Sequence, residues 1–358
     1  MLGEQGLLSN TLMVAAVNEA GQGSWSAAVS NLHEAIQISE EIGDTWQWEE
    51  STSHLAHLEF YRGHFGASRL LYEQASASAK IRRDKKMINR CQAGIASVML
   101  ATGDFSGALQ ILRTTNSYGP TALALMREGK QSEAYSMALK VKDRFKGRRT
   151  KYYVLKSFVA VCDVFLQLYE SSVRTRDLDR KREMPDRRMQ SSQSRRFDMG
   201  VTLAGSTRAL PKSHSIPLPF LSASPSRMSG GSVGSGGSAG SAGEGVEPEQ
   251  QAEDPDTLQA MCQEWIDKLT QFSTVYALAS PRTLLCRGRL RIISGSPVEG
   301  LRLLRKSQQL AAKMQMPYDE ALAQQLLSRH TKGSARESQQ AAQEAQEIFS
   351  RLGVDPGL

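Results

Sequence analysis

The sequence contains a motif that recurs with a period of 40 residues. Trp25, Phe65 and Phe105 are 40 positions apart, and each follows a glycine by two residues. A small residue comes three positions after the aromatic, a larger apolar residue seven positions after it, and usually another small residue ten positions after it. The alanines at these small positions are Ala28, Ala35, Ala75 and Ala108. A fixed period of this length predicts stacked copies of one supersecondary unit.

Each part of the motif has a physical role in a helical hairpin. The glycine allows the tight turn that ends one helix. The aromatic fills the corner between two antiparallel helices, and the small residues let the second helix approach its partner closely. Weaker copies begin at Gly129, Gly295 and Gly333. Apolar residues recur at intervals of three and four without sustained strand-like alternation. We therefore predict an all-α solenoid of stacked helical hairpins.

A long segment of different composition interrupts the repeats. Residues 171–257 contain only two aromatics and are rich in serine and glycine. Such a segment buries too little apolar surface to offset the entropy of ordering, so we expect it to be disordered. The predicted organisation is helical repeats over 1–170, the insert, and further repeats over 258–353. Tyr152–Glu170 and Leu258–Ala279 are amphipathic, and we expect these helices to pair across the insert.

The net charge of +7 and the isoelectric point near 9.2 raise the question of a nucleic-acid partner. The excess of basic over acidic residues lies in two runs, Lys140–Lys151 with a net charge of +6 and Arg174–Arg196 with +5. The rest of the chain is therefore mildly acidic. These runs lack the repeated aromatics of a stacking platform, and we favour a solubilising tether over nucleic-acid binding. An acidic partner, RNA, anionic lipid or nuclear import are the alternatives. The tether residues singled out are Lys146, Arg148, Arg149, Arg187 and Arg188.

The sequence contains no constellation typical of catalysis or of cofactor binding. Its four cysteines are scattered without a CxxC pair, so we expect neither a disulfide framework nor a zinc site. His54 and His57 are three residues apart, which is not the HExxH spacing, and we favour repeat-surface histidines over a metal site. No apolar run reaches the roughly 18 residues of a membrane span. We expect a cytoplasmic protein without catalysis, cofactor, metal or membrane span; its oligomeric state is left open.

The repeat resembles the tetratricopeptide-repeat family, in a longer form of about 40 residues. This resemblance implies a groove, built by the first helices of the hairpins, that holds an extended or helical segment of another protein. The leading expectation is therefore a scaffold that binds other proteins or peptides. The residues expected on first helices near the groove are Asn18, Glu19, His57, Glu59 and Arg291.

Two segments carry a more specific resemblance. Ala279–Leu285 reads ASPRTLL, and Met316–Ala323 reads MPYDEALA. They are similar to the C-terminal repeat region of signalling proteins that join class III adenylyl or guanylyl cyclase domains to an AAA/STAND-type ATPase. The chain contains no GxxxxGK[ST] phosphate loop and no paired metal-binding aspartates in a β-rich context. This resemblance therefore implies an alternative function, a regulatory arm without the enzyme, with a cyclase or ATPase module as its partner.

Overall fold

The structure is a computed structural model that describes residues 2–144, 152–183, 254–331 and 335–355. Contacts divide the chain into two units, one formed by Met1–Leu178 with Ala252–Leu358 and the other by Asp179–Gln251. The expected tether residues lie outside the described ranges. They are Lys146, Arg148, Arg149, Arg187 and Arg188.

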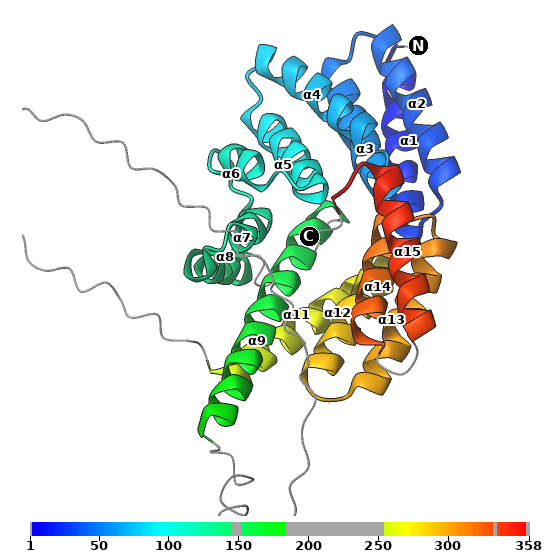
Figure 1. Cartoon of the computed structure of the whole chain (residues 1–358). Helices are drawn as coiled ribbons and strands as arrows, with labels where there is room; N and C mark the ends of the chain where they lie inside the picture. The colour runs from blue at the N-terminus through cyan, green and yellow to red at the C-terminus, as the bar shows by residue number, and fades with distance from the viewer. Residues whose placement is uncertain (1, 145–151, 184–253, 332–334, 356–358) are drawn as a thin grey trace, which may run out of the picture. The chain divides into compact units, whose positions relative to one another are not determined.

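The described residues form helices and contain no strand, so the predicted all-α class is confirmed (Figure 1). Consecutive helices pair as antiparallel hairpins that stack on one another. The first four hairpins are α1 (Leu2–Gln22) with α2 (Trp25–Glu41), α3 (Thr45–Tyr61) with α4 (Phe65–Ile81), α5 (Lys85–Thr102) with α6 (Phe105–Leu112), and α7 (Tyr118–Arg127) with α8 (Gln131–Arg144). The later helices are α9 (Leu155–Glu183), α11 (Pro255–Val275), α12 (Ser280–Ile293), α13 (Pro297–Lys313), α14 (Pro317–His330) and α15 (Ala335–Leu352), with short 3-10 turns η1 (Tyr152–Val154) and η2 (Ala277–Ala279).

The repeat motif occupies the turn between the two helices of a hairpin. Gly23 and Gly63 adopt φ angles of 81° and 80°, in the left-handed region that suits glycine. The repeat aromatics are the first residues of α2, α4 and α6. Trp25 and Phe65 are buried, while Phe105 is half-buried. The predicted turn and corner positions are thus confirmed at these hairpins.

The small residues of the motif lie where the paired helices come closest. Ser9 of α1 donates a hydrogen bond from its Oγ to the carbonyl oxygen of Ala35 in α2 at 2.9 Å, and its Oγ lies 2.8 Å from that of Ser39. A bulkier side chain at these positions would separate the helices. The predicted alanines are all fully buried, as the motif requires: Ala28, Ala35, Ala75 and Ala108.

Helices α9 and α11, which come before and after residues 184–253, contact each other. The ring centroid of Phe158 in α9 lies 5.5 Å from that of Trp265 and 6.0 Å from that of Phe272, both in α11. Further along α9, Tyr169 donates a hydrogen bond to Gln259 at 2.9 Å. The order of these contacts makes the two helices antiparallel, as expected from their amphipathic patterns.

The helices continue beyond the boundaries that the sequence predicted for the insert. We expected the insert to begin at residue 171, but α9 extends to Glu183, and α11 begins at Pro255. Charged pairs at helical spacing account for the extension, because Arg174 pairs with Glu170 four residues earlier. Composition alone does not show how charged residues are spaced, so these residues were interpreted as part of the insert.

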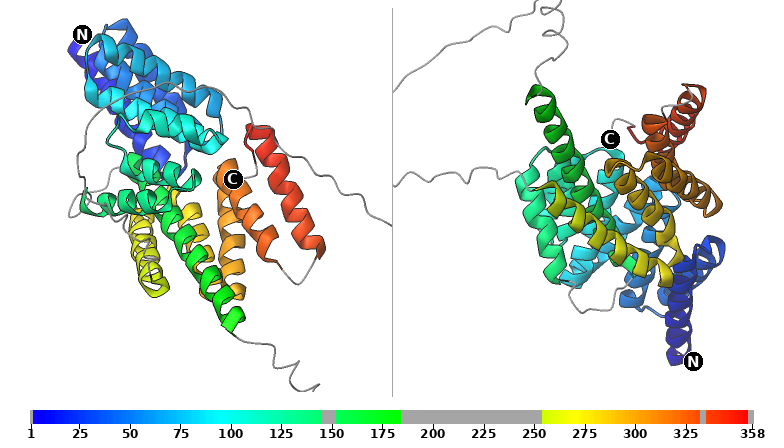
Figure 2. Two further views of the ribbon diagram at one scale, coloured as in Figure 1. Left: turned by 60° about the vertical axis from the view of Figure 1, so that its left-hand side comes forward. Right: turned by 90° about the horizontal axis from the view of Figure 1, so that it is seen from below.

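Helix α9 lies between α6–α8 on one side and α12–α14 on the other (Figure 1). Figure 2 shows the same helices from two further sides. A Cβ atom built on Gly119 of α7 would lie 2.7 Å from the Cα of Ser157, so the α7 and α9 backbones are in close contact. The two ends also meet directly, since Trp25 donates its indole N–H to the carbonyl oxygen of Met314. Phe65, Phe349 and Val354 share one small apolar cluster.

By length and composition, the segment Tyr152–Arg180 could cross a membrane. In the structure, however, 61% of its most apolar window is buried within the protein. Lys156 and Asp163 lie within this segment, and Asp163 is only 8% exposed. The apolar part of this segment therefore belongs to the core of the first unit, whereas residues 174–178 are exposed.

Candidate functional site: a cavity between the first helices

A cavity of about 560 Å³ lies between the first helices of successive hairpins. Its lining comes from α3, α5, α7, α9, α12 and α14, with one residue from η2, and none of it comes from the second helices of the described hairpins. We call it the first-helix cavity. Each helix presents one face to it at helical spacing, as with Pro120, Leu123 and Arg127 of α7. The resemblance implied a groove built by the first helices, and these helices line this cavity.

The α9 helix presents a polar stripe to the first-helix cavity. Its members follow one another at intervals of seven, four, three and four residues, which places them on one face of a helix. Between Leu155 and Tyr169 the other residues of this helix are largely apolar and buried, whereas residues 174–180 are exposed. A polar stripe on a core helix is stable only where the neighbouring elements or a ligand provide partners. The stripe consists of Lys156, Asp163, Gln167, Glu170 and Arg174.

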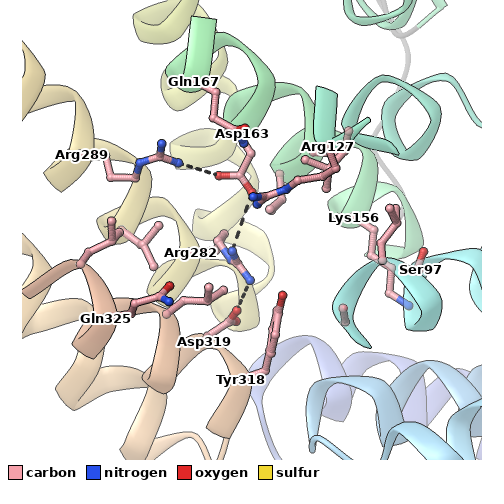
Figure 3. A pocket seen from close by; sticks show the side chains of 18 of the residues that line it. Ser97, Arg127, Lys156, Asp163, Gln167, Arg282, Arg289, Tyr318, Asp319 and Gln325 are labelled. Carbon is pink, nitrogen blue, oxygen red and sulfur yellow. Dashed lines mark hydrogen bonds and ion pairs between the residues drawn. The ribbon is translucent and has the colours of Figure 1, made fainter. Parts of the chain in front are cut away.

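Part of this stripe joins an ion-pair network across three helices (Figure 3). Arg289 of α12 donates to Asp163 and to Glu170, at 3.4 Å each. Arg282 of α12 lies 3.9 Å from Asp163 and forms an ion pair with Asp319 of α14. These charged side chains therefore connect α9, α12 and α14 around the cavity.

The network is buried, and its charges stabilise one another. Asp163 and Asp319 are 8% and 5% exposed. Burial alone would lower the pKa of the Arg282 guanidinium, but Asp319 and Asp163 more than offset this and raise it. Arg282 therefore stays charged throughout the physiological range, and its removal would leave the buried carboxylates of Asp163 and Asp319 with less compensation.

Lys156, near the start of α9, is a buried cation of a different kind. Its Nζ atom is buried and has no hydrogen-bond partner among the described residues. It lies 3.6 Å from the ring centroid of Phe60, with Tyr61 and Tyr72 at 5.9 Å and 5.7 Å. Burial lowers the pKa of Lys156 to about 7, because aromatic rings replace only part of the lost hydration.

Two further buried donors of the first-helix cavity have no partner. The hydroxyl of Tyr61 and the amide nitrogen of Gln167 are both buried without a hydrogen bond in the described part of the chain. A buried polar atom without a partner is uncommon in a native structure and calls for an explanation. With Lys156, these atoms make the cavity rich in unused donors.

The lining of the first-helix cavity has an excess of positive charge. Its Asp and Glu side chains are all engaged with arginines of the cavity itself. The cationic members outnumber the anionic ones by six to three, which favours anionic ligands. The cations are Arg127, Lys156, Arg174, Arg282, Arg289 and Arg329, and the anions are Asp163, Glu170 and Asp319.

The repeat aromatics support the wall of this cavity. Trp25 stacks on Tyr61, with 6.5 Å between the ring centroids and 14° between the planes. Phe65 contacts both Phe60 and Tyr318, with centroid distances of 5.4 Å and 5.7 Å. The repeat motif therefore fixes the turns and also holds the aromatic residues that line the cavity.

A second cavity, of about 660 Å³, lies on the other side of Lys156. Lys156, Ser97 and Pro120 line both cavities. His54 and His57 line the second one, where the Nδ1 atom of His54 lies 2.7 Å from the hydroxyl of Tyr152. Burial lowers the pKa of His54 to about 3, with Arg90 adding to the shift. Both histidines are therefore neutral members of the aromatic packing.

The residues expected near the groove lie elsewhere. Asn18 is exposed on α1, and Glu19 accepts a hydrogen bond from Asn31 of α2 at 2.9 Å. Glu59 is held by Arg62 and His64 at the turn after α3. Arg291 is exposed and pairs with Glu299 at 3.5 Å. His57 lines the second cavity, and none of these five residues lines the first-helix cavity.

The residues that do line the first-helix cavity had a detectable signal. Charged residues break the apolar run of α9 at Lys156 and, seven positions later, at Asp163. This spacing marks one helix face. The partners Arg282 and Asp319 are far away in the sequence, so their pairing could not be read from local spacing.

The described residues contain no cluster of His, Cys, Asp and Glu side chains that could hold a metal ion. The four cysteines are free and buried. Burial raises the pKa of Cys91 and of Cys262 to about 12, so both are thiols at neutral pH.

No model of a known protein family matches this chain. A search of curated proteins likewise finds no match.

Proposed function

We propose that the protein is an interaction scaffold that binds a segment of a partner protein in the first-helix cavity. The observation that carries this proposal is the composition of the lining, which comes from the first helices of successive hairpins. Solenoid proteins use the surface formed by equivalent elements of stacked repeats to bind partners. The second helices of the described hairpins do not line the cavity and pack against the first helices as a supporting layer.

The chemistry of the lining also supports binding. An apolar floor with a few convergent polar groups is typical of ligand sites, and 560 Å³ lies within their usual size range. Apolar residues such as Leu123, Val159 and Leu322 alternate with the charged ones. Such a lining provides both buried apolar area and orientation for a bound segment.

Site-specific photocrosslinking tests this proposal. A benzoylphenylalanine at Arg329, which is exposed and lines the cavity, is compared with one at Val298, which is 83% exposed on α13 outside it. Both proteins are expressed in the native cell and irradiated. We expect a defined polypeptide to crosslink from position 329 and not from 298. Equal crosslinking from both positions, or none from 329, would overturn the proposal.

One observation favours the alternative function as a regulatory arm of a cyclase or ATPase. The two segments that resemble such proteins provide Arg282, Tyr318 and Asp319, which all line the first-helix cavity. Under this proposal, the partner is a cyclase or ATPase module. Mass spectrometry of the polypeptide crosslinked from position 329 decides between the two, because a polypeptide without either module would exclude the regulatory arm.

A further inference from the structure

Among the described residues, the unpaired donors of the first-helix cavity have no acceptor within hydrogen-bond distance. Asp163 and Asp319 are already engaged by Arg282 and Arg289, and Glu170 by Arg174 and Arg289. No carboxylate of the described lining is therefore left for Lys156. The missing group is an oxygen with negative charge, since that is the partner a buried ammonium group requires.

Figure 3 places this unpaired amine apart from the ion-pair network. Lys156 lies beside Ser97, whereas Arg289, Asp163, Arg282 and Asp319 form a connected chain across the view. The hydroxyl of Ser97 donates a hydrogen bond to the carbonyl oxygen of Ala93 at 2.7 Å, and its oxygen makes no hydrogen bond with the amine. The Lys156 end of the cavity is thus a separate subsite.

The spacing of the unused donors indicates the shape of the ligand. Lys156 and Gln167 are eleven residues apart on the same face of α9, which corresponds to about 16 Å along the helix. A small anion cannot contact both donors, whereas an extended peptide of about five residues covers this distance. The two donors therefore fit one extended segment that runs along α9.

We propose that the first-helix cavity binds an extended acidic peptide segment, with an Asp or Glu carboxylate accepting a hydrogen bond from Lys156. Further along α9, the amide of Gln167 donates to a carbonyl or carboxamide oxygen of the same segment. The apolar lining between them, including Val159 and Leu322, receives an apolar side chain of the segment. This inference rests on the proposed scaffold function and specifies its ligand.

A displayed library of random heptapeptides, selected on the full chain, tests this inference. We expect the selected peptides to share an Asp or Glu at one position. A synthetic peptide from the selection should lose at least about tenfold in affinity when that residue becomes Gln or when Lys156→Met is introduced. The Glu-to-Gln change should cost nothing further on the Lys156→Met protein, because the two changes remove the same contact.

Two other variants separate a local effect from a loss of folding. Gln167→Leu should weaken the same peptide by about threefold. Arg305→Met, on an exposed arginine of α13 that pairs with Glu337 outside the cavity, should leave affinity unchanged. Lys156→Gln keeps a polar side chain without the charge and should lose affinity as Lys156→Met does. Thermal melts of each variant establish that the folded protein is being compared.

Three outcomes would overturn the inference. The first is a set of peptides without an acidic preference, and the second is unchanged affinity in Lys156→Met. The third is a thermal shift with succinate or phosphate that depends on Lys156 while no peptide is selected, because the ligand would then be a small anion. Crosslinking from position 329 together with any of these outcomes would leave the scaffold proposal standing, whereas the absence of such crosslinking would remove both.

Discussion

Two of the buried cations that line the first-helix cavity, Arg282 and Lys156, differ in their surroundings. Arg282 lies between Asp163 and Asp319, and its charge is compensated by both. Lys156 faces aromatic rings and has no carboxylate partner among the described residues. The paired cation contributes to the architecture because it connects α9, α12 and α14. The unpaired one costs stability, and such a cost is typical of sites where binding supplies the missing partner.

Substitution of Arg282 should produce the largest effect. Arg282→Met leaves Asp319 buried without its partner, and we expect the free energy of unfolding to fall by about 3–5 kcal/mol. Urea denaturation followed by circular dichroism measures this loss. The double variant Arg282→Met with Asp319→Leu should regain most of it, since an apolar pair replaces the ion pair. A loss below about 1 kcal/mol in Arg282→Met would show that the paired cation is not structural.

Substitution of Lys156 should act in the opposite direction. Lys156→Met removes a buried charge without a partner, so we expect the free energy of unfolding to rise by about 1–2 kcal/mol at pH 7. The gain is limited because the cation–π contact with Phe60 is lost. The same urea measurement checks it. Destabilisation of more than about 1 kcal/mol would place Lys156 with Arg282 as a structural residue.

The pH dependence of stability sharpens the same contrast. The pKa of Lys156 is about 7 in the folded protein, whereas lysine in an unfolded chain has a pKa of about 10.4. Between these values the unfolded state binds more protons, so the stability of the native sequence rises with pH. The advantage of Lys156→Met should therefore shrink as pH increases from 7 to 10. A constant difference between the two proteins over this range would contradict the assignment.

The smallest effect is expected at an exposed arginine outside the cavity. Arg291 pairs with Glu299 at 3.5 Å, and both side chains are more than 40% exposed. Such a pair contributes little, so Arg291→Ala should change the free energy of unfolding by less than about 0.5 kcal/mol. Peptide affinity should also be unchanged. A marked loss of peptide affinity would show that Arg291 takes part in binding, as the sequence analysis predicted.

The sequence predicts the fold better than it predicts the residues of the candidate site. Trp25, Phe65 and Ala35 occupy turn and packing positions that recur in each hairpin, so a 40-residue period is enough to place them. Glu59 shows why the groove was harder to predict. It lies on a first helix, as expected, but its neighbours Arg62 and His64 hold it at the turn.

The cavity depends on which helix faces meet, and this is a non-local property. Lys156 and Asp163 share a face of α9 that the sequence does reveal. Their different roles follow from Arg282 and Arg289, which reach Asp163 and leave Lys156 alone. These arginines are more than 100 positions away from the polar stripe of α9 in the sequence. Residue spacing within one helix therefore cannot predict that they contact it.

The contact between Trp25 and Met314 has a consequence for unfolding. An open array of repeats frays from its ends, because each unit is held only by its immediate neighbours. Here the first and the later hairpins brace each other through this hydrogen bond and through the cluster around Phe65 and Phe349. Loss of one terminal hairpin would therefore weaken the opposite end as well. Melting should proceed as one cooperative transition, and the high contact order of these links should make refolding slow for an all-helical protein.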